Sequence, residues 1–224
     1  MENTRIIKVT GRGGIKLTPD VTRITATIEG LRAEYSEAME SSSETAERLR
    51  GALEQLGFAR AQLKTLALGV DAEYEGYQDE RGNYRQRFSG YRYRHTMKLE
   101  FPCDNALLGR TLYSLAHSGA DPELQISYTV SDREVAKNEL LSRAVADAKS
   151  KAAVLADAAG VELGGIRSIC CSDGEPALEV HPMHKAAFAR SEEAADSAFG
   201  SYNVDITPDD IEAFGSVTVV WEIL

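Results

Sequence analysis

The stretch AVADAKSKAAVLADAAGVELGGI, residues 144–166, decides much of the fold. It is rich in alanine, lacks aromatic residues and ends at Gly160, the usual residue of a helix C-cap. We predict a helix that begins near Asp132, with apolar residues every three or four positions. The predicted stripe consists of Leu141, Ala144, Val145, Ala148, Ala152, Leu155 and Ala159. Because alanine is small and has the highest helix propensity, this helix is expected to lie close to a sheet or to another helix.

Other segments show either the two-residue alternation of strands or the three-to-four-residue period of helices. In VTRITATIEG, Thr22, Ile24, Ala26 and Ile28 share one face. Strands are predicted at 5–10, 21–30, 66–74, 91–101, 123–130, 165–171 and 216–224, and two further helices at 34–56 and 104–120, with Asp104 as the N-cap of the latter. GRGG at 11–14 is predicted as a tight hairpin turn and 76–90 as a long hairpin loop. Residues 172–214 are predicted as a long loop that is partly helical, mobile or an oligomer contact.

The order of these elements predicts an α+β protein made of two-layer α/β sandwiches. Residues 20–131 have the order βαββαβ, which is the ferredoxin-like or split-βαβ arrangement. Residues 1–19 would join 132–224, including the long loop, in a second small α/β layer built from both chain ends. The sequence therefore predicts two domains, of which the second is discontinuous.

Composition and charge limit the classes of partner. Of the 224 residues, 43% are apolar and 27% are charged, and the formal net charge is −10. Such an acidic chain is repelled by nucleic-acid phosphates and by anionic membrane surfaces, so neither is expected as a partner. No apolar run approaches the roughly 20 residues of a membrane span, and the N-terminus lacks a secretory signal. As written the chain is expected in the cytoplasm, or in the periplasm or outside the cell if a leader has been removed.

No motif predicts catalytic, cofactor-binding or metal-binding residues. The three cysteines contain no CxxC pair, and HPMH at 181–184 has a proline between its histidines and no evident third ligand. GRGG is expected to precede a strand, whereas a phosphate loop precedes a helix. The G-x-S-x-G motif of hydrolases is absent. The neighbouring carboxylates Glu73 and Glu75, Asp79 and Glu80, and Asp209 and Asp210 are read as solvated surface groups.

An aromatic and arginine-rich stretch is the strongest candidate for an interaction site. Tyrosine and arginine are enriched in protein interfaces. The alternative reading is an extended two-stranded arm with its own cross-strand pairs, and a site for an anionic partner is a third. The candidate interface residues are Tyr77, Tyr84, Arg85, Arg87, Phe88 and Tyr91.

Several of these segments together resemble the SIMPL-domain family of bacterial proteins. The resemblance rests on IIKVTGRGGIKLTPDVTRITATIEG (6–30), GYRYRHTMKLEF (90–101), the segment from Ser131 to Ile166, and PDDIEAFGSVTVVWEI (208–223). It implies relatives that are mostly exported, a loose link to oxidative stress, and an oligomer that is ring-shaped in one member. The family has no agreed catalytic residues, so none is transferred to this chain.

Two functions follow. The favoured one is a non-enzymatic, homo-oligomeric binding or scaffold protein, with no cofactor and with an unknown ligand. The alternative is an enzyme or small-ligand carrier with a pocket between the two layers, because pockets assemble from residues far apart in sequence.

Overall fold

A computed structural model describes residues 5–79, 82–171, 176–181 and 200–224. It confirms the α+β class, with helices packed on two separate sheets. The chain divides into two compact units. Unit 1 comprises Met1–Asp20, Thr129–Val180 and Pro208–Leu224, and unit 2 comprises Val21–Tyr128 and His181–Thr207.

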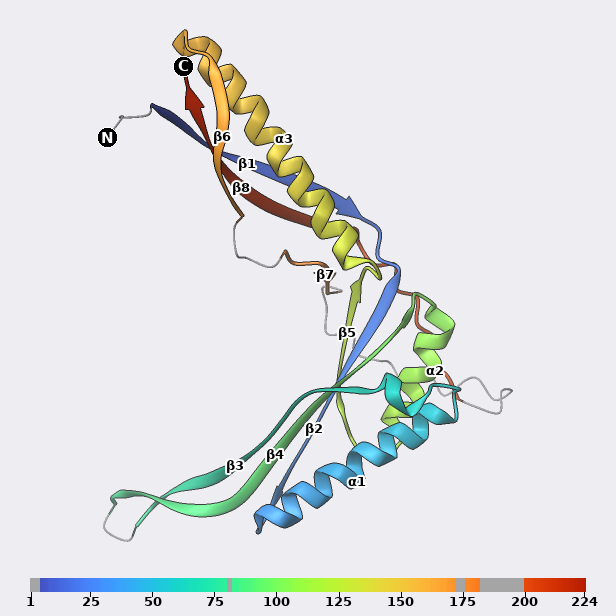
Figure 1. Cartoon of the computed structure of the whole chain (residues 1–224). Coiled ribbons are helices and arrows are strands. Elements are labelled where there is room, and N and C mark those ends of the chain that lie inside the picture. The colour runs from blue at the N-terminus through green and yellow to red at the C-terminus, as the bar shows by residue number, and fades with distance from the viewer. Residues whose placement is uncertain (1–4, 80–81, 172–175, 182–199) are drawn as a thin grey trace. The chain divides into compact units, whose positions relative to one another are not determined.

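Unit 2 contains the βαββαβ arrangement. Its strands have the order β3-β4-β2-β5, and β4 pairs antiparallel with both β3 and β2. The helices α1 and α2 pack on the sheet (Figure 1). The elements are β2 (Val21–Arg32), α1 (Tyr35–Glu54), the short 3-10 helix η1 (Arg60–Gln62), β3 (Lys64–Gln78), β4 (Tyr84–Pro102), α2 (Asn105–Ala116) and β5 (Glu123–Thr129).

The core of unit 2 follows the predicted periodicities. The face of β2 that carries Ile24 and Ile28 is buried, and so are Met97 and Leu99 on the paired strand. Leu49 of α1 lies in the same apolar cluster. Asp104 is the N-cap of α2, as predicted, because its side chain accepts hydrogen bonds from the first backbone N–H groups of the helix.

The prediction of a loop at 76–90 is wrong. The ladder between β3 and β4 continues to the pair Gln78–Tyr84, so these residues form a long two-stranded ribbon that extends past the start of α1 (Figure 1). Its outer side chains are exposed on both faces. A strand with no buried face needs no apolar alternation, and its composition is therefore that of a loop.

Unit 1 brings the two ends of the chain together. Its sheet has the order β1-β8-β6, and β1 pairs with β8 along its whole length, from Ile6–Glu222 to Leu17–Ile211. The helix α3 covers one face of this sheet. The elements are β1 (Ile6–Leu17), α3 (Arg133–Ala159), β6 (Leu163–Cys171), β7 (Glu179–Val180) and β8 (Ile211–Ile223).

The prediction of a tight turn at GRGG is also wrong. These residues lie inside β1, where Gly11 pairs with Val217 and Gly13 with Gly215. Gly11 and Gly13 face α3, and the missing side chains let the helix backbone approach the strand. Glycine in a strand interior thus marks a close backbone approach here and not a turn.

The helix of the alanine stretch is present, but its buried row differs from the predicted one. The buried residues are Ala136, Leu140, Ala144, Ala148, Ala152 and Ala156. Leu141, Leu155 and Ala159, which were predicted in the stripe, are exposed. A constant spacing of four residues moves about 40° around a helix at each step. This drifting row matches a sheet that twists beneath the helix.

Part of the predicted loop 172–214 is ordered as strand. Leu178 is buried, Glu179–Val180 form β7, and the Thr129 hydroxyl donates a hydrogen bond of 2.7 Å to the Leu178 carbonyl. Residues 211–214 belong to β8, which therefore starts earlier than predicted. Within the described ranges, the helices are too short or too polar to span a bilayer.

Candidate functional site

We call residues 70–79 and 82–92, in and between β3 and β4, the β3–β4 arm. This arm carries the predicted interface residues. The strand β3 lies at the edge of the sheet. Tyr74 pairs with Phe88 and Gln78 with Tyr84, while Tyr77 pairs with Arg85. Because side chains alternate between the faces of a strand, the first two pairs share one face and the third lies on the other. The arm therefore has two chemically distinct faces.

One face of the arm carries a row of aromatic rings. The Tyr74 and Phe88 ring centroids lie 5.8 Å apart, and those of Phe88 and Tyr91 lie 5.2 Å apart. Tyr91 in turn contacts Tyr35 at the start of α1, with 5.7 Å between centroids. These three pairs have the edge-to-face geometry that aromatic rings favour. Phe88 is nevertheless 48% exposed and Tyr84 is 83% exposed, so the row is open to solvent.

The opposite face of the arm is covered by ion pairs. Arg87 contacts Glu75 at 2.8 Å, and Arg92 pairs with Glu73, whose pKa this hydrogen bond holds below its usual value. Neighbouring pairs join Arg85 with Asp79 at 2.8 Å and Arg94 with Glu29 at 3.0 Å. Each of these guanidinium groups already has a carboxylate partner. The face is thus poorly suited to bind an anion.

The structure does not bring the six predicted interface residues onto one surface. Tyr84, Phe88 and Tyr91 lie on the aromatic face, whereas the side chains of the other three point to the ion-pair face, as the register shows. The three on the ion-pair face are Tyr77, Arg85 and Arg87. A single flat partner would therefore contact one triplet only.

Several of the neighbouring carboxylates of the sequence have structural partners, while Glu80 lies outside the described residues. Glu73, Glu75 and Asp79 form the ion pairs of the arm. Asp210 accepts a hydrogen bond from Thr18 at 3.0 Å and lies 3.4 Å from the Lys16 amine. Residues 182–184 of HPMH lie outside the described residues, so the structure does not test a metal site there.

A buried histidine makes a contact that resembles a catalytic pair. The Ser42 hydroxyl lies 3.2 Å from Nδ1 of His95, and the Thr65 hydroxyl lies 2.8 Å from Nε2. Ser42 is 1% exposed and His95 is 6% exposed. Burial, and secondarily the charge of Arg50, lower the pKa of His95. Ser42 and His95 therefore form a hydrogen-bonded pair within the core, whereas Thr65 on the other side of the ring is exposed.

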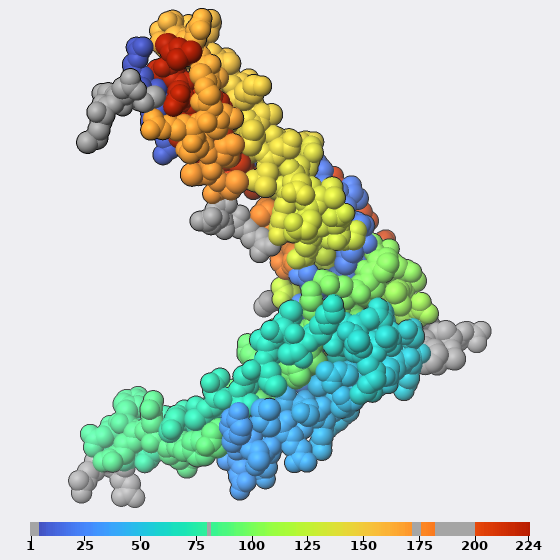
Figure 2. All heavy atoms as spheres, viewed as in Figure 1, coloured from blue at the N-terminus to red at the C-terminus, as the bar shows by residue number. Residues whose placement is uncertain are grey.

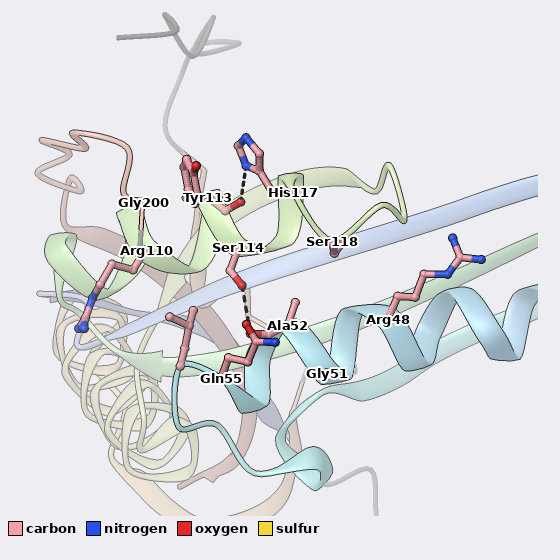
Figure 3. Close-up of a pocket in the computed structure, with 11 residues that line it drawn as sticks. Arg48, Gly51, Ala52, Gln55, Arg110, Tyr113, Ser114, His117, Ser118 and Gly200 are labelled. Carbon is pink, nitrogen blue, oxygen red and sulfur yellow. Dashed lines mark hydrogen bonds between the residues drawn. The ribbon is translucent and has the colours of Figure 1, made fainter. Parts of the chain in front are cut away.

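A cavity of about 590 Å³ lies beside the ends of α1 and α2 within unit 2 (Figure 3). Sequence reasoning missed it, because its walls come from three separate segments. Its volume is in the range of small-molecule pockets. The residues that line it are Arg48, Gly51, Ala52, Gln55, Leu56, Arg110, Tyr113, Ser114, His117, Ser118 and Gly200.

Comparison with known proteins points to one family. The SIMPL family model, described as a protein of unknown function (DUF541), matches residues 7–221. The chain is 27% identical over 164 residues to a protein named "26 kDa periplasmic immunogenic protein" from Brucella melitensis biotype 1, and equally to one of that name from Brucella abortus strain S19. Each match covers 73% of this chain and 65% of the relative, slightly under two thirds of the relative's length.

Proposed function

Because the chain belongs to the SIMPL family, whose function is unknown, we propose that it is a non-enzymatic scaffold protein that self-associates through the β3–β4 arm. The observation that carries the proposal is the open row of aromatic rings formed by Tyr74 of the edge strand β3 and by Phe88 and Tyr91 of its partner β4. Aromatic side chains lose little conformational entropy on binding and are enriched at the centres of interfaces.

The backbone of the arm offers a second kind of contact. The outer edge of β3 is available to a further strand, and an edge strand can extend its sheet by pairing with another chain. Leu66 and Leu68 are 53% and 45% exposed on this strand. Figure 2 shows the outer half of the arm with only its own two strands at the surface. Main-chain pairing of β3 with a strand of another copy, together with contacts between the aromatic rings, would hold a homo-oligomer together.

Light scattering after size-exclusion chromatography tests this proposal. The unaltered protein at micromolar concentration is expected to have a mass that is a multiple of one chain. Phe88→Asp places a charge in the ring row and is expected to lower that mass. The matched control is Phe214→Asp, which replaces a phenylalanine that is 70% exposed on β8 of unit 1. The control is expected to keep the mass of the unaltered protein.

Two results would contradict the proposal. A monomeric mass for the unaltered protein would exclude self-association under these conditions. An equal loss of mass in Phe88→Asp and Phe214→Asp would show that the arm is not the specific contact. Circular dichroism of each variant separates a lost contact from a lost fold.

We also propose a periplasmic location, since the Brucella relatives are named as periplasmic proteins. Fractionation of cells that express the full gene tests it, and recovery with the cytoplasmic fraction would contradict it. A role in stress physiology rests on the family resemblance alone. A deletion strain with unaltered resistance to peroxide would count against that role.

A further inference from the structure

The charge of the cavity in unit 2 differs from the charge of the protein. The chain contains 35 acidic and 25 basic residues. Among the described residues, the cavity lining nevertheless includes Arg48, Arg110 and His117 and contains neither aspartate nor glutamate. A wall with basic groups and without carboxylates creates a local positive potential, which attracts anions into the cavity.

The shape of the cavity depends on a glycine in the interior of α1. Gly51 lines the cavity, and a Cβ atom added there would have no neighbouring atom within 4 Å. Glycine destabilises a helix interior relative to alanine. Packing of the described residues therefore does not require glycine at this position. A larger side chain would instead project into the space that the cavity provides.

Two of the basic groups are held in place by hydrogen bonds. Nη1 of Arg48 donates to the Gly119 carbonyl at 2.9 Å, which leaves the remaining N–H groups of that guanidinium for a ligand. Nδ1 of His117 donates to the Tyr113 carbonyl at 2.8 Å, and the two rings stack with centroids 4.0 Å apart. This hydrogen bond fixes the imidazole ring of His117 and leaves Nε2 as its free nitrogen. Groups fixed before binding lose less entropy when a ligand arrives.

The other arginine of the lining has no such partner. In the described part of the chain, Arg110 has neither a hydrogen bond nor an ion pair. Figure 3 shows Arg48 on α1 and Arg110 on α2, on opposite sides of the other lining residues, with their guanidinium groups turned away from each other. A guanidinium binds a carboxylate or phosphate through two parallel hydrogen bonds. The guanidinium of Arg110 is therefore available to one anionic group of a ligand, while Arg48 and His117 add to the local positive potential.

We propose that this cavity binds a small organic anion, one carboxylate or phosphate group of which contacts Arg110. The ligand would pass beside Gly51 and contact the stacked pair of Tyr113 and His117. The site lies on the helix layer, away from the β3–β4 arm of the same unit. Its test therefore does not depend on self-association.

Nuclear magnetic resonance titration of the full ¹⁵N-labelled chain tests the site. The anionic probes are glutarate and pyrophosphate, and glutaramide is the uncharged analogue of glutarate. Glutarate or pyrophosphate is expected to shift the amide signals of Gly51 and Ser118 saturably below about 10 mM, whereas glutaramide is not. The Gly76 amide, in the arm, is expected not to move. A response to glutarate alone identifies carboxylates, and a response to pyrophosphate alone identifies phosphates.

Two variants make the test decisive. Arg110→Met is expected to weaken binding about tenfold, because one charge-assisted pair of hydrogen bonds is lost. Gly51→Leu is expected to abolish binding while the melting temperature stays the same or rises, since leucine fills the cavity and favours the helix. The proposal is overturned if neither glutarate nor pyrophosphate shifts the amide signals of the cavity. It is also overturned if glutaramide binds as well as glutarate, or if binding survives in Gly51→Leu.

Discussion

A Cβ atom added to Gly11 of β1 would lie 2.0 Å from the backbone carbonyl oxygen of Ala144 in α3. Two non-bonded heavy atoms do not approach so closely, so the backbones of the helix and the strand are in direct contact at this glycine. The Cβ atom of Ala148, one turn further along the same row, would lie 2.7 Å from the added atom. The glycines of the strand and the alanines of the helix are thus two halves of one packing arrangement. Both ends of the chain depend on it, because β1 pairs with β8 beneath α3.

We expect Gly11→Ala to destabilise unit 1 by about 1–3 kcal/mol or more, because the added methyl group would force the helix away from the sheet. Gly165→Ala is the control, since that glycine lies in β6 with nothing within 4 Å of an added Cβ. Urea unfolding, with amide hydrogen exchange of β1 as the local probe, measures the difference. Equal stability of the two variants would contradict the close-packing argument.

The fold was predictable where a periodic pattern has one physical cause. The alternation of β2 predicted its buried face, and Asp104 and Gly160 predicted helix ends correctly. Glycine was ambiguous, because a turn and a close backbone approach both require it. The pattern of GRGG is the same in either case. Only the alanine row of α3, which is distant in sequence, distinguishes them.

The candidate sites were less predictable, because their geometry depends on details that periodicity does not show. The register shift between Glu73 and Tyr74 changes which side chains share a face, and a sequence pattern does not reveal it. The cavity combines α1, α2 and Gly200, which are separated by many residues. Its one visible signal was Gly51, an isolated glycine in a helical pattern.

The N-cap of α2 offers a measurable check of a confirmed prediction. One carboxylate oxygen of Asp104 accepts hydrogen bonds from Ala106 N at 2.8 Å and Leu107 N at 3.0 Å. Asp104→Ala is expected to lower the free energy of unfolding by about 1 kcal/mol, because these donors lose their partner. Asp104→Asn keeps an acceptor oxygen and is expected to retain most of the stability. No loss of stability in Asp104→Ala would show that the cap contributes little, and equal losses in the two variants would show that an acceptor oxygen alone does not account for it.

We expect the stability of unit 2 to fall as the pH drops below about 6.5, in part through His95. Burial lowers its pKa in the folded protein, so the unfolded chain takes up the proton first. Where the unfolded state binds more protons, the free energy of unfolding rises with pH. His95 is therefore expected to contribute up to about 1 kcal/mol of destabilisation between pH 6.5 and 5.5.

Urea unfolding at both pH values, compared between the unaltered protein and His95→Gln, isolates this contribution, since the carboxylates titrate in both. Glutamine does not titrate in this range, so the dependence on pH should be weaker in the variant. His117→Gln, at an exposed position, is the matched control. The interpretation fails if the variant His95→Gln and the unaltered protein lose the same free energy on acidification.

The last prediction concerns Tyr128, which is 2% exposed and whose hydroxyl has no hydrogen-bond partner among the residues that the structure describes. A buried hydroxyl without a partner costs desolvation free energy. Tyr128→Phe removes only that group, so it is expected to raise stability at neutral pH by about 1 kcal/mol. Tyr128→Ala is expected to lower it by about 3–5 kcal/mol, because it leaves a cavity in the core.

Alkaline titration adds an independent readout. Burial, and secondarily Cys103, raise the pKa of Tyr128 to about 12. Between pH 10 and 12 the unfolded chain therefore loses the phenolic proton while the folded protein keeps it, and stability falls as the pH rises. This fall should be smaller in Tyr128→Phe, which has no phenol to ionise. If phenolate absorbance shows every tyrosine of the folded protein titrating near pH 10, then water reaches the Tyr128 hydroxyl and its burial is refuted.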